Sequence, residues 1–183
     1  MSYSLPLTIK NCLGEELTFH RIEMQDGEEK LVIENYVAPG ASPMVHTLHM
    51  QDECLIVLHG RLGYQFLGEE PKYATIGESV LFKKGTPHRF WNAGKDELNC
   101  YGWIKPVHNI IFHLTALFNS INESGTERPT QFDSAYLLQR YGKELDIPGI
   151  PKIVKSVLLP ATYQIGKLTG KYKKFKDAPL PLE

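Results

Sequence analysis

The sequence predicts a mostly β fold, a small barrel or jelly roll, followed by C-terminal α-helices. From about Leu17 to Lys105, short segments rich in Val, Ile, Phe and Tyr alternate with Gly, Pro and acidic clusters. About eight strands in such a short stretch are typical of a small barrel or a jelly roll. Beyond Pro106, apolar residues recur at three- and four-residue intervals, which indicates amphipathic helices. The length suits one globular domain with an appendage.

The expected strands are short apolar and aromatic segments separated by turn residues. Their ranges are 17–24, 29–37, 44–50, 54–59, 62–68, 78–83, 87–92 and 98–105. Turn sequences such as "QDGEE" and "KKGTP" separate them. We therefore expect residues 1–105 to form the barrel domain.

The expected helices lie in residues 106–183, which we predict to be an extension packed on the barrel. Two of them cover 109–121 and 133–145, the second opening with an Asp suited to an N-cap. A third amphipathic segment, 150–172, contains Pro160, which should kink or end the helix.

The third amphipathic segment is also strongly basic. Seven lysines and no acidic residue lie between Ile150 and Lys176. Its apolar face could pack on the barrel or on a partner subunit, with the lysines solvated, or it could lie on an anionic membrane surface. We favour packing, because Pro160 interrupts the helix that would lie on the membrane.

Charge and cysteine usage limit the class of protein. The net charge of −1 gives no reason to expect nucleic acid as a partner. We see no secretory signal and no apolar run long enough to span a membrane. The three cysteines, an odd number without pair-like spacing, indicate a reduced compartment. We therefore predict a cytoplasmic protein.

Candidate metal ligands stand just ahead of a buried strand in the stretch "VHTLHMQDECLIVLHG", residues 45–60. On a regular strand, His49 and Glu53 point to the same side, together with Thr47. His46 has the opposite parity, so it would face outward unless a bulge or the preceding turn rotates it. His88 follows a Gly-Thr-Pro turn and adds a second imidazole.

The burial of Glu53 against the apolar run "CLIVL" would be costly unless a cation or hydrogen bonds paired it. Two imidazoles and one carboxylate suit a divalent iron, nickel, manganese or zinc ion. We therefore predict a divalent metal site with His46, His49, Glu53 and His88 as candidate ligands. The alternative is a barrel that binds no metal and serves only as a scaffold.

These residues resemble two sequence motifs of the cupins, in particular of small single-domain bacterial members. The first motif, G-x5-H-x-H-x3or4-E-x6-G, is matched to Gly40, His49, Glu53 and Gly60, with Thr47 in the place of the first histidine. The second motif, G-x5-P-x4-H-x3-N, is matched to Gly77, His88 and Asn92, with Lys83 in the place of the proline. The resemblance covers roughly residues 30–105.

The resemblance implies a double-stranded β-helix whose metal ligands are His49, Glu53 and His88. Because Thr47 replaces a ligand, two alternatives follow. The strand shifts register and His46 supplies the missing ligand, or the site keeps two histidines and one carboxylate, a set that suits non-haem iron. We favour the first alternative.

The function that follows is a metal-binding small cupin acting on a small organic molecule, as a dioxygenase-like oxidoreductase or an isomerase. The alternative is a non-catalytic cupin that binds or senses a small ligand, so the sequence leaves open whether the protein is an enzyme. The predicted ligand pocket is lined by Thr47, Tyr64, Phe90, Tyr101 and Trp103. We also expect a homodimer, because open sheet edges need covering, with the N-terminal segment or the first helix at the contact.

Overall fold

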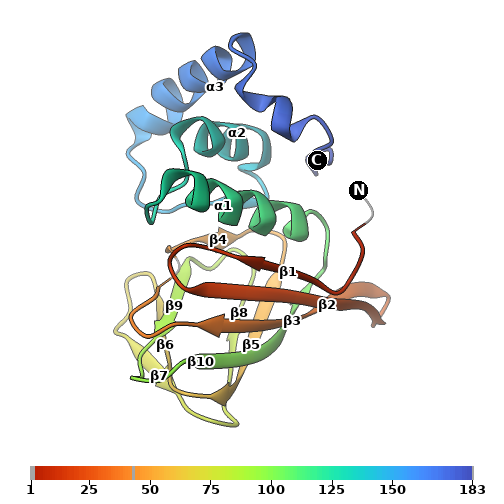
Figure 1. Cartoon of the computed structure of the whole chain (residues 1–183), viewed down its shortest axis with the longest axis vertical. Helices are drawn as coiled ribbons and strands as arrows, with labels where there is room; N and C mark the ends of the chain where they lie inside the picture. The colour runs from red at the N-terminus through yellow and green to blue at the C-terminus, as the bar shows by residue number, and fades with distance from the viewer. Residues whose placement is uncertain (1–2, 43, 183) are drawn as a thin grey trace.

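The strands and the helices occupy two separate layers of the molecule. The computed structural model describes residues 3–42 and 44–182. The strands form a barrel, and the helices stack on one end of it in the order α1, α2, α3 (Figure 1). The two ends of the chain lie on the same side of the molecule, close to the helices (Figure 1).

The strands follow the chain almost without interruption up to Lys105. They are β1 (Leu7–Lys10), β2 (Glu15–Gln25), β3 (Glu28–Val37), β4 (Thr47–Leu48), β5 (Asp52–His59), β6 (Leu62–Phe66), β7 (Lys72–Ala74), β8 (Ser79–Phe82), β9 (His88–Asn92), β10 (Leu98–Lys105) and, after the second helix, β11 (Leu145–Asp146). The six-stranded sheet has the order β1-β2-β3-β10-β5-β8, and the smaller sheets are β7-β6-β9 and β11-β4. The predicted jelly-roll barrel is confirmed.

The main difference from the predicted strands lies at residues 44–50, where only Thr47–Leu48 is a strand. Strands β1, β7 and β11 were not predicted. Each has at most four residues and shows no clear alternation of apolar and polar residues of its own.

The barrel interior follows the two-residue alternation of the strands. Along β10, Leu98, Cys100, Gly102 and Ile104 are buried and the residues between them are not. A Cβ at Gly102 would lie 2.0 Å from the carbonyl oxygen of Cys54, so glycine is required where β10 and β5 approach each other. The inward-facing set therefore includes small residues as well as large apolar ones.

Helix α1 (Ile110–Ser124) covers the open end of the barrel. Its residues Ile110, Ile111, Phe118 and Ile121 belong to the same core as the strands, so this helix is part of the barrel's packing. Gly125 ends the helix in the left-handed conformation with φ of 65°, where a glycine is favoured.

Helix α2 (Gln131–Tyr141) packs on α1 and starts a second core. The side chain of Thr130 accepts the N–H of Asp133, so Thr130 is the N-cap and the predicted N-cap Asp133 lies three residues further on. The second core contains Phe112 and Ala116 of α1 together with residues of α2.

The C-terminal segment consists of a π-helical turn, η1 (Val154–Leu158), then α3 (Leu159–Leu168) and a 3-10 turn, η2 (Lys171–Phe175). Pro160 lies in the first turn of α3, and the Leu159 N–H bonds to the Val154 carbonyl five residues back. The prediction was that Pro160 kinks or ends the helix. The helical run does not end there, but it is irregular before the proline: the π-helical turn η1 precedes Pro160, and this wider turn lets the chain continue without the missing N–H.

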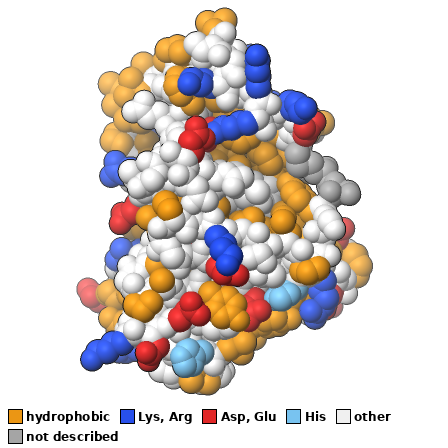
Figure 2. Space-filling view, in the orientation of Figure 1, with side chains coloured by type: hydrophobic (Ala, Val, Ile, Leu, Met, Phe, Trp, Pro, Cys, Tyr) orange, Lys and Arg blue, Asp and Glu red, His pale blue; other side chains and the backbone are white. Residues whose placement is uncertain are grey.

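The C-terminal segment packs on α2 through aromatic rings. Phe175 stacks on Tyr136 with ring centroids 4.3 Å apart, and Tyr172 lies 4.9 Å from the same ring. Its aliphatic residues, by contrast, are exposed: Ile153, Val157, Leu158, Ile165 and Leu168. The expectation that these residues pack on the barrel is not met within one chain. Hydrophobic side chains and lysines lie next to each other on this upper part of the molecule (Figure 2).

Within the described ranges, no helix has both the length and the apolar character needed to cross a membrane.

Candidate functional site

Three side chains from separate segments meet inside the barrel. Glu53 comes from β5, His88 begins β9, and His46 lies just before β4. The backbones of His46 and His88 pair in both directions, with N···O distances of 2.9 and 3.0 Å. This bridge holds the two imidazoles side by side, although His46 lies outside any regular strand.

The ligand atoms of His46, Glu53 and His88 all lie within 4.8 Å of one another. Glu53 Oε2 is 3.4 Å from His88 Nε2 and 3.9 Å from His46 Nε2. Two ligands about 2.1 Å from one metal ion at a tetrahedral angle are about 3.4 Å apart. The spacing of the three side chains therefore fits a shared cation.

The outer nitrogen of each imidazole is already committed to the backbone. His46 Nδ1 donates to the Met44 carbonyl and His88 Nδ1 donates to the Thr86 carbonyl, both at 2.9 Å. A carbonyl oxygen only accepts, so in the neutral imidazole each Nε2 is left with a lone pair. Backbone carbonyls of this kind fix the tautomer of metal-binding histidines.

Aromatic packing fixes the orientation of the second imidazole. The ring of Phe82 stacks on His88 with centroids 4.1 Å apart and an angle of 9° between the planes. His88 is fully buried, so this ring has little freedom to turn away from Glu53.

The electrostatics of the cluster favour a negative carboxylate beside a positive group. Burial acts to raise the pKa of Glu53, but His46 and His88 outweigh it and lower this pKa to about 2. Burial likewise acts to lower the pKa of His46, and the Glu53 carboxylate outweighs it and raises this pKa. A buried carboxylate facing two lone pairs requires a positive charge, which either protons or a metal ion can supply.

His49 does not join the cluster, so its predicted convergence with Glu53 is wrong. It is exposed, and its N–H donates to the Glu144 carbonyl at 2.9 Å. The parity argument failed because the strand is interrupted between Leu48 and Asp52, and alternation does not carry across such a break.

The first motif is also corrected by one position. Five residues separate Gly40 from His46, so His46 stands at the first histidine and Leu48, not Thr47, is the departure from the pattern. Leu48 is buried in the apolar core. His46 is therefore in the place that the first of our two alternatives gave it.

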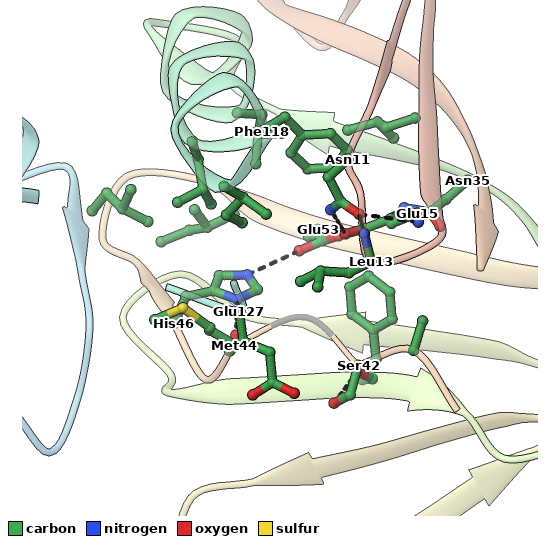
Figure 3. Close-up of a pocket in the computed structure, with 18 of the residues that line it drawn as sticks. Asn11, Leu13, Glu15, Asn35, Ser42, Met44, His46, Glu53, Phe118 and Glu127 are labelled. Carbon is green, nitrogen blue, oxygen red and sulfur yellow. Dashed lines mark hydrogen bonds and ion pairs between the residues drawn. The ribbon is translucent and has the colours of Figure 1, made fainter. Parts of the chain in front are cut away.

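Beside the cluster is a cavity of about 90 Å³. The cavity is therefore larger than the site of a single water molecule and can hold a small molecule. His46 and Glu53 lie in its wall, and α1 closes one side with Leu114, Leu117 and Phe118 (Figure 3). Apart from a few polar groups the lining is apolar, as in most small-molecule sites.

Of the residues predicted to line a pocket, only Phe90 does so. Thr47 is buried outside the lining, and Tyr64 packs against Phe66 and Phe82. Tyr101 and Trp103 occupy the outward-facing positions of β10, because the inward positions belong to the alternate set. Aromatic character alone does not show which face of a strand a residue occupies.

The sequence reasoning missed a polar group elsewhere in the cavity wall, formed by Asn11, Glu15 and Asn35. A signal was present for Asn35, since it has the same parity as Leu31, Ile33 and Val37 in an apolar strand. Glu15 lies before the predicted start of its strand, so alternation was not applied to it.

Comparisons with known proteins agree with this architecture. Residues 35–103 match the family described as "Cupin domain". No curated protein sequence matches the chain.

Three of the similar solved structures come from bacteria. A conserved protein with a double-stranded beta-helix domain from Klebsiella pneumoniae has 15% identity, covers 59% of this chain and 84% of its own, and gives a TM-score of 0.42. A cupin-like protein from Thermotoga maritima has 22% identity, coverage of 55% and 74%, and a TM-score of 0.43. KdgF from Halomonas sp. has 14% identity, coverage of 57% and 89%, and a TM-score of 0.47.

Proposed function

We propose that this chain, whose residues 35–103 match a cupin domain, uses a divalent metal ion to act on a small organic molecule. His46, Glu53 and His88 would hold the ion, and the small molecule would bind in the adjacent cavity. The reaction class is that of a dioxygenase-like oxidoreductase or an isomerase. Iron, nickel, manganese and zinc all accept two imidazoles and one carboxylate.

The observation that carries the proposal is the fixed tautomer of both histidines. Each Nδ1 is used by a backbone carbonyl, so both Nε2 atoms are directed to Glu53 as acceptors. Three acceptors that face one another inside an apolar barrel repel unless protons or a metal ion lie between them. The placement of the two Nε2 atoms and the Glu53 carboxylate therefore supports a metal site.

The metal ion, when bound, would act as a Lewis acid that polarises an oxygen of the bound molecule. The protein's own residues orient the reactants. The two backbone carbonyls, together with the stacking of Phe82 on His88, keep the imidazoles in place, while α1 covers one side of the cavity. With three protein ligands, coordination positions remain for the small molecule.

A non-catalytic cupin that binds or senses a ligand is the second candidate. Leu48 favours it, because an apolar residue stands where the motif has its second histidine. The two candidates differ in turnover: an enzyme converts its substrate in air, stops when the metal is chelated and resumes with one metal, whereas a sensor binds its ligand without consuming it.

The metal site is tested by elemental analysis and metal titration of purified variants. We expect Glu53→Gln, His88→Ala and His46→Ala each to lower metal affinity by roughly 100-fold or more, because each removes one of three ligands. His49→Ala is the matched control and should retain the affinity of the wild type, since His49 is exposed. If no metal copurifies in stoichiometric amount and none can be loaded, the proposed metal site does not exist.

A further inference from the structure

The cavity wall contains a second buried polar group, away from the metal ligands. Asn35 Nδ2 donates to Glu15 Oε1 at 3.0 Å, and Asn11 Nδ2 donates to Glu15 Oε2 at 3.1 Å. All three residues line the cavity that also contains His46 and Glu53 (Figure 3). Glu15 and Asn35 are buried, so water outside the protein does not solvate them.

One atom of this group has no partner. Asn35 Oδ1 is buried and accepts no hydrogen bond from any residue in 3–42 or 44–182. Asn35 is 3% exposed and has the inward-facing parity of β3, so its side chain lies in the cavity wall. A buried amide oxygen without a donor is destabilising, so a partner is expected from the molecule that fills the cavity.

Rotating the amide of Asn35 does not remove the deficit. In the rotated form Oδ1 faces Glu15, which must then carry a proton to donate, and the NH₂ group is left facing the cavity. Burial raises the pKa of Glu15, against the lowering effect of its bonds to Asn35 and Asn11. A hydroxyl group both donates and accepts, so it pairs with the amide in either orientation.

We propose that the Glu15–Asn35 pair is a recognition subsite for a hydroxyl group of the small molecule whose other end binds the metal. Most of the remaining lining is apolar, with Leu17, Ile33 and Phe118 among its walls, and its other polar residues include Ser42 and Glu127. The ligand class is therefore a small hydroxylated carboxylate or a similar oxygen donor with an apolar body of few carbons. This inference rests on the proposed metal site only for the end of the ligand that binds the metal.

The preference of the subsite for a hydroxyl group can be tested with simple probes. The probes are 4-hydroxybutanoate, 5-hydroxypentanoate and 6-hydroxyhexanoate, each compared with the alkanoate that carries a methyl group in place of the hydroxyl. Calorimetric titration into the metal-loaded full chain measures both members of each pair. We expect the hydroxylated member to bind roughly tenfold or more tightly at one length at least, because the methyl analogue leaves Asn35 unpaired.

Asn35→Leu keeps the shape of the side chain and removes both polar atoms, so it should abolish or reverse that preference. Asn99→Leu is the matched control on the outer part of β10, where the Asn99 amide donates to Glu34, and it should leave the preference intact. Thermal unfolding reports whether each variant is folded. The comparison of hydroxyl and methyl probes in the wild type stands even if Asn35→Leu does not fold.

Equal binding of the two members at every length, or no binding of any hydroxylated probe, would overturn the subsite. A preference that survives in Asn35→Leu would also overturn it, since the amide would not be its source. The metal titration is read separately: wild-type protein that takes up metal but shows no hydroxyl preference refutes this inference alone, whereas failure to bind metal refutes the proposed function.

Discussion

The barrel buries polar side chains, whereas the C-terminal segment exposes apolar ones. Inside the barrel Glu53, His88 and Asn35 are each almost wholly buried, while Leu168 in the C-terminal segment is 88% exposed. Both placements run against the ordinary preference of these residue types. Buried polar groups that face a cavity indicate a ligand, and an exposed apolar face indicates a partner or a surface, so the two regions point to different kinds of interaction.

The two regions also differ in how they are held. The barrel is closed by strand pairing and one continuous core that includes α1. The C-terminal segment is held by a few rings on α2 and by polar bonds near the end of the chain. Tyr141 Oη donates to the Pro179 carbonyl at 2.7 Å, and the Leu182 N–H donates to Glu144 Oε1 at 2.9 Å.

The largest effect is expected from removing the C-terminal segment, residues 150–183. This deletion exposes Tyr136, Tyr141 and Phe112, and each large side chain returned to water costs roughly 1.5–3 kcal/mol. We expect a loss of roughly 3–6 kcal/mol in the free energy of unfolding and a melting temperature lower by roughly 10 °C or more. Calorimetry of the shortened chain measures both.

The control for the deletion is a substitution on the exposed aliphatic face, such as Leu168→Ser. This variant keeps the aromatic rings of the C-terminal segment, so it should keep the stability of the full chain. A shortened protein as stable as the full chain would show that the C-terminal segment is not part of the folded body. Salt-sensitive binding of the full chain to anionic vesicles would then favour the membrane alternative.

A smaller effect is expected from pH at the junction between the two regions. His113 of α1 is 1% exposed, its Nε2 has no hydrogen bond within the described ranges, and burial lowers its pKa to about 4. The Glu144 carboxylate, 3.8 Å from that nitrogen, acts in the opposite direction.

Between about pH 6.5 and 4 the unfolded chain binds a proton at His113 that the folded chain does not. Stability from this residue is therefore complete above pH 6.5 and falls as the pH is lowered, by about 1–3 kcal/mol in total once Glu144 is allowed for. Urea unfolding at several pH values measures the slope, and His113→Gln should make it shallower. An unchanged slope would mean that Glu144 fully compensates the burial.

The smallest effect is expected at the exposed aliphatic face. Leu168→Ser should change the free energy of unfolding by less than about 0.5 kcal/mol, because the side chain is already in water. Phe175→Ala, seven residues on and stacked on Tyr136, should cost several times more.

A charged substitution at the same position tests the predicted homodimer. If the aliphatic face is the contact between two copies, Leu168→Glu should convert a dimer to a monomer in light scattering at micromolar concentration. A monomeric wild-type protein would remove the homodimer prediction, and a dimer unaffected by Leu168→Glu would place the contact elsewhere.

The sequence by itself determined the barrel, the helices and two of the three residues of the His46–Glu53–His88 cluster. Glu53 and His88 follow from local patterns, since strand alternation and the fixed spacing around Gly77 and Gly60 depend only on nearby residues. At Gly60, φ of 82° and the closeness of the Glu97 carbonyl explain why the spacing must end in a glycine.

The tertiary structure shows which of His46 and His49 joins the cluster. His46 pairs with His88, forty-two residues away in the sequence, whereas His49 follows the end of β4 and its N–H donates to the Glu144 carbonyl. The spacing of the first motif, counted from Gly40, also selects His46. The exposure of the C-terminal aliphatic residues was decided in the same way, because a helical period shows which residues share a face but not whether another element covers it. The polar pair Glu15 and Asn35 likewise became a site only when β2 and β3 curved around the cavity, since a contact between distant segments leaves no trace in the local pattern of either.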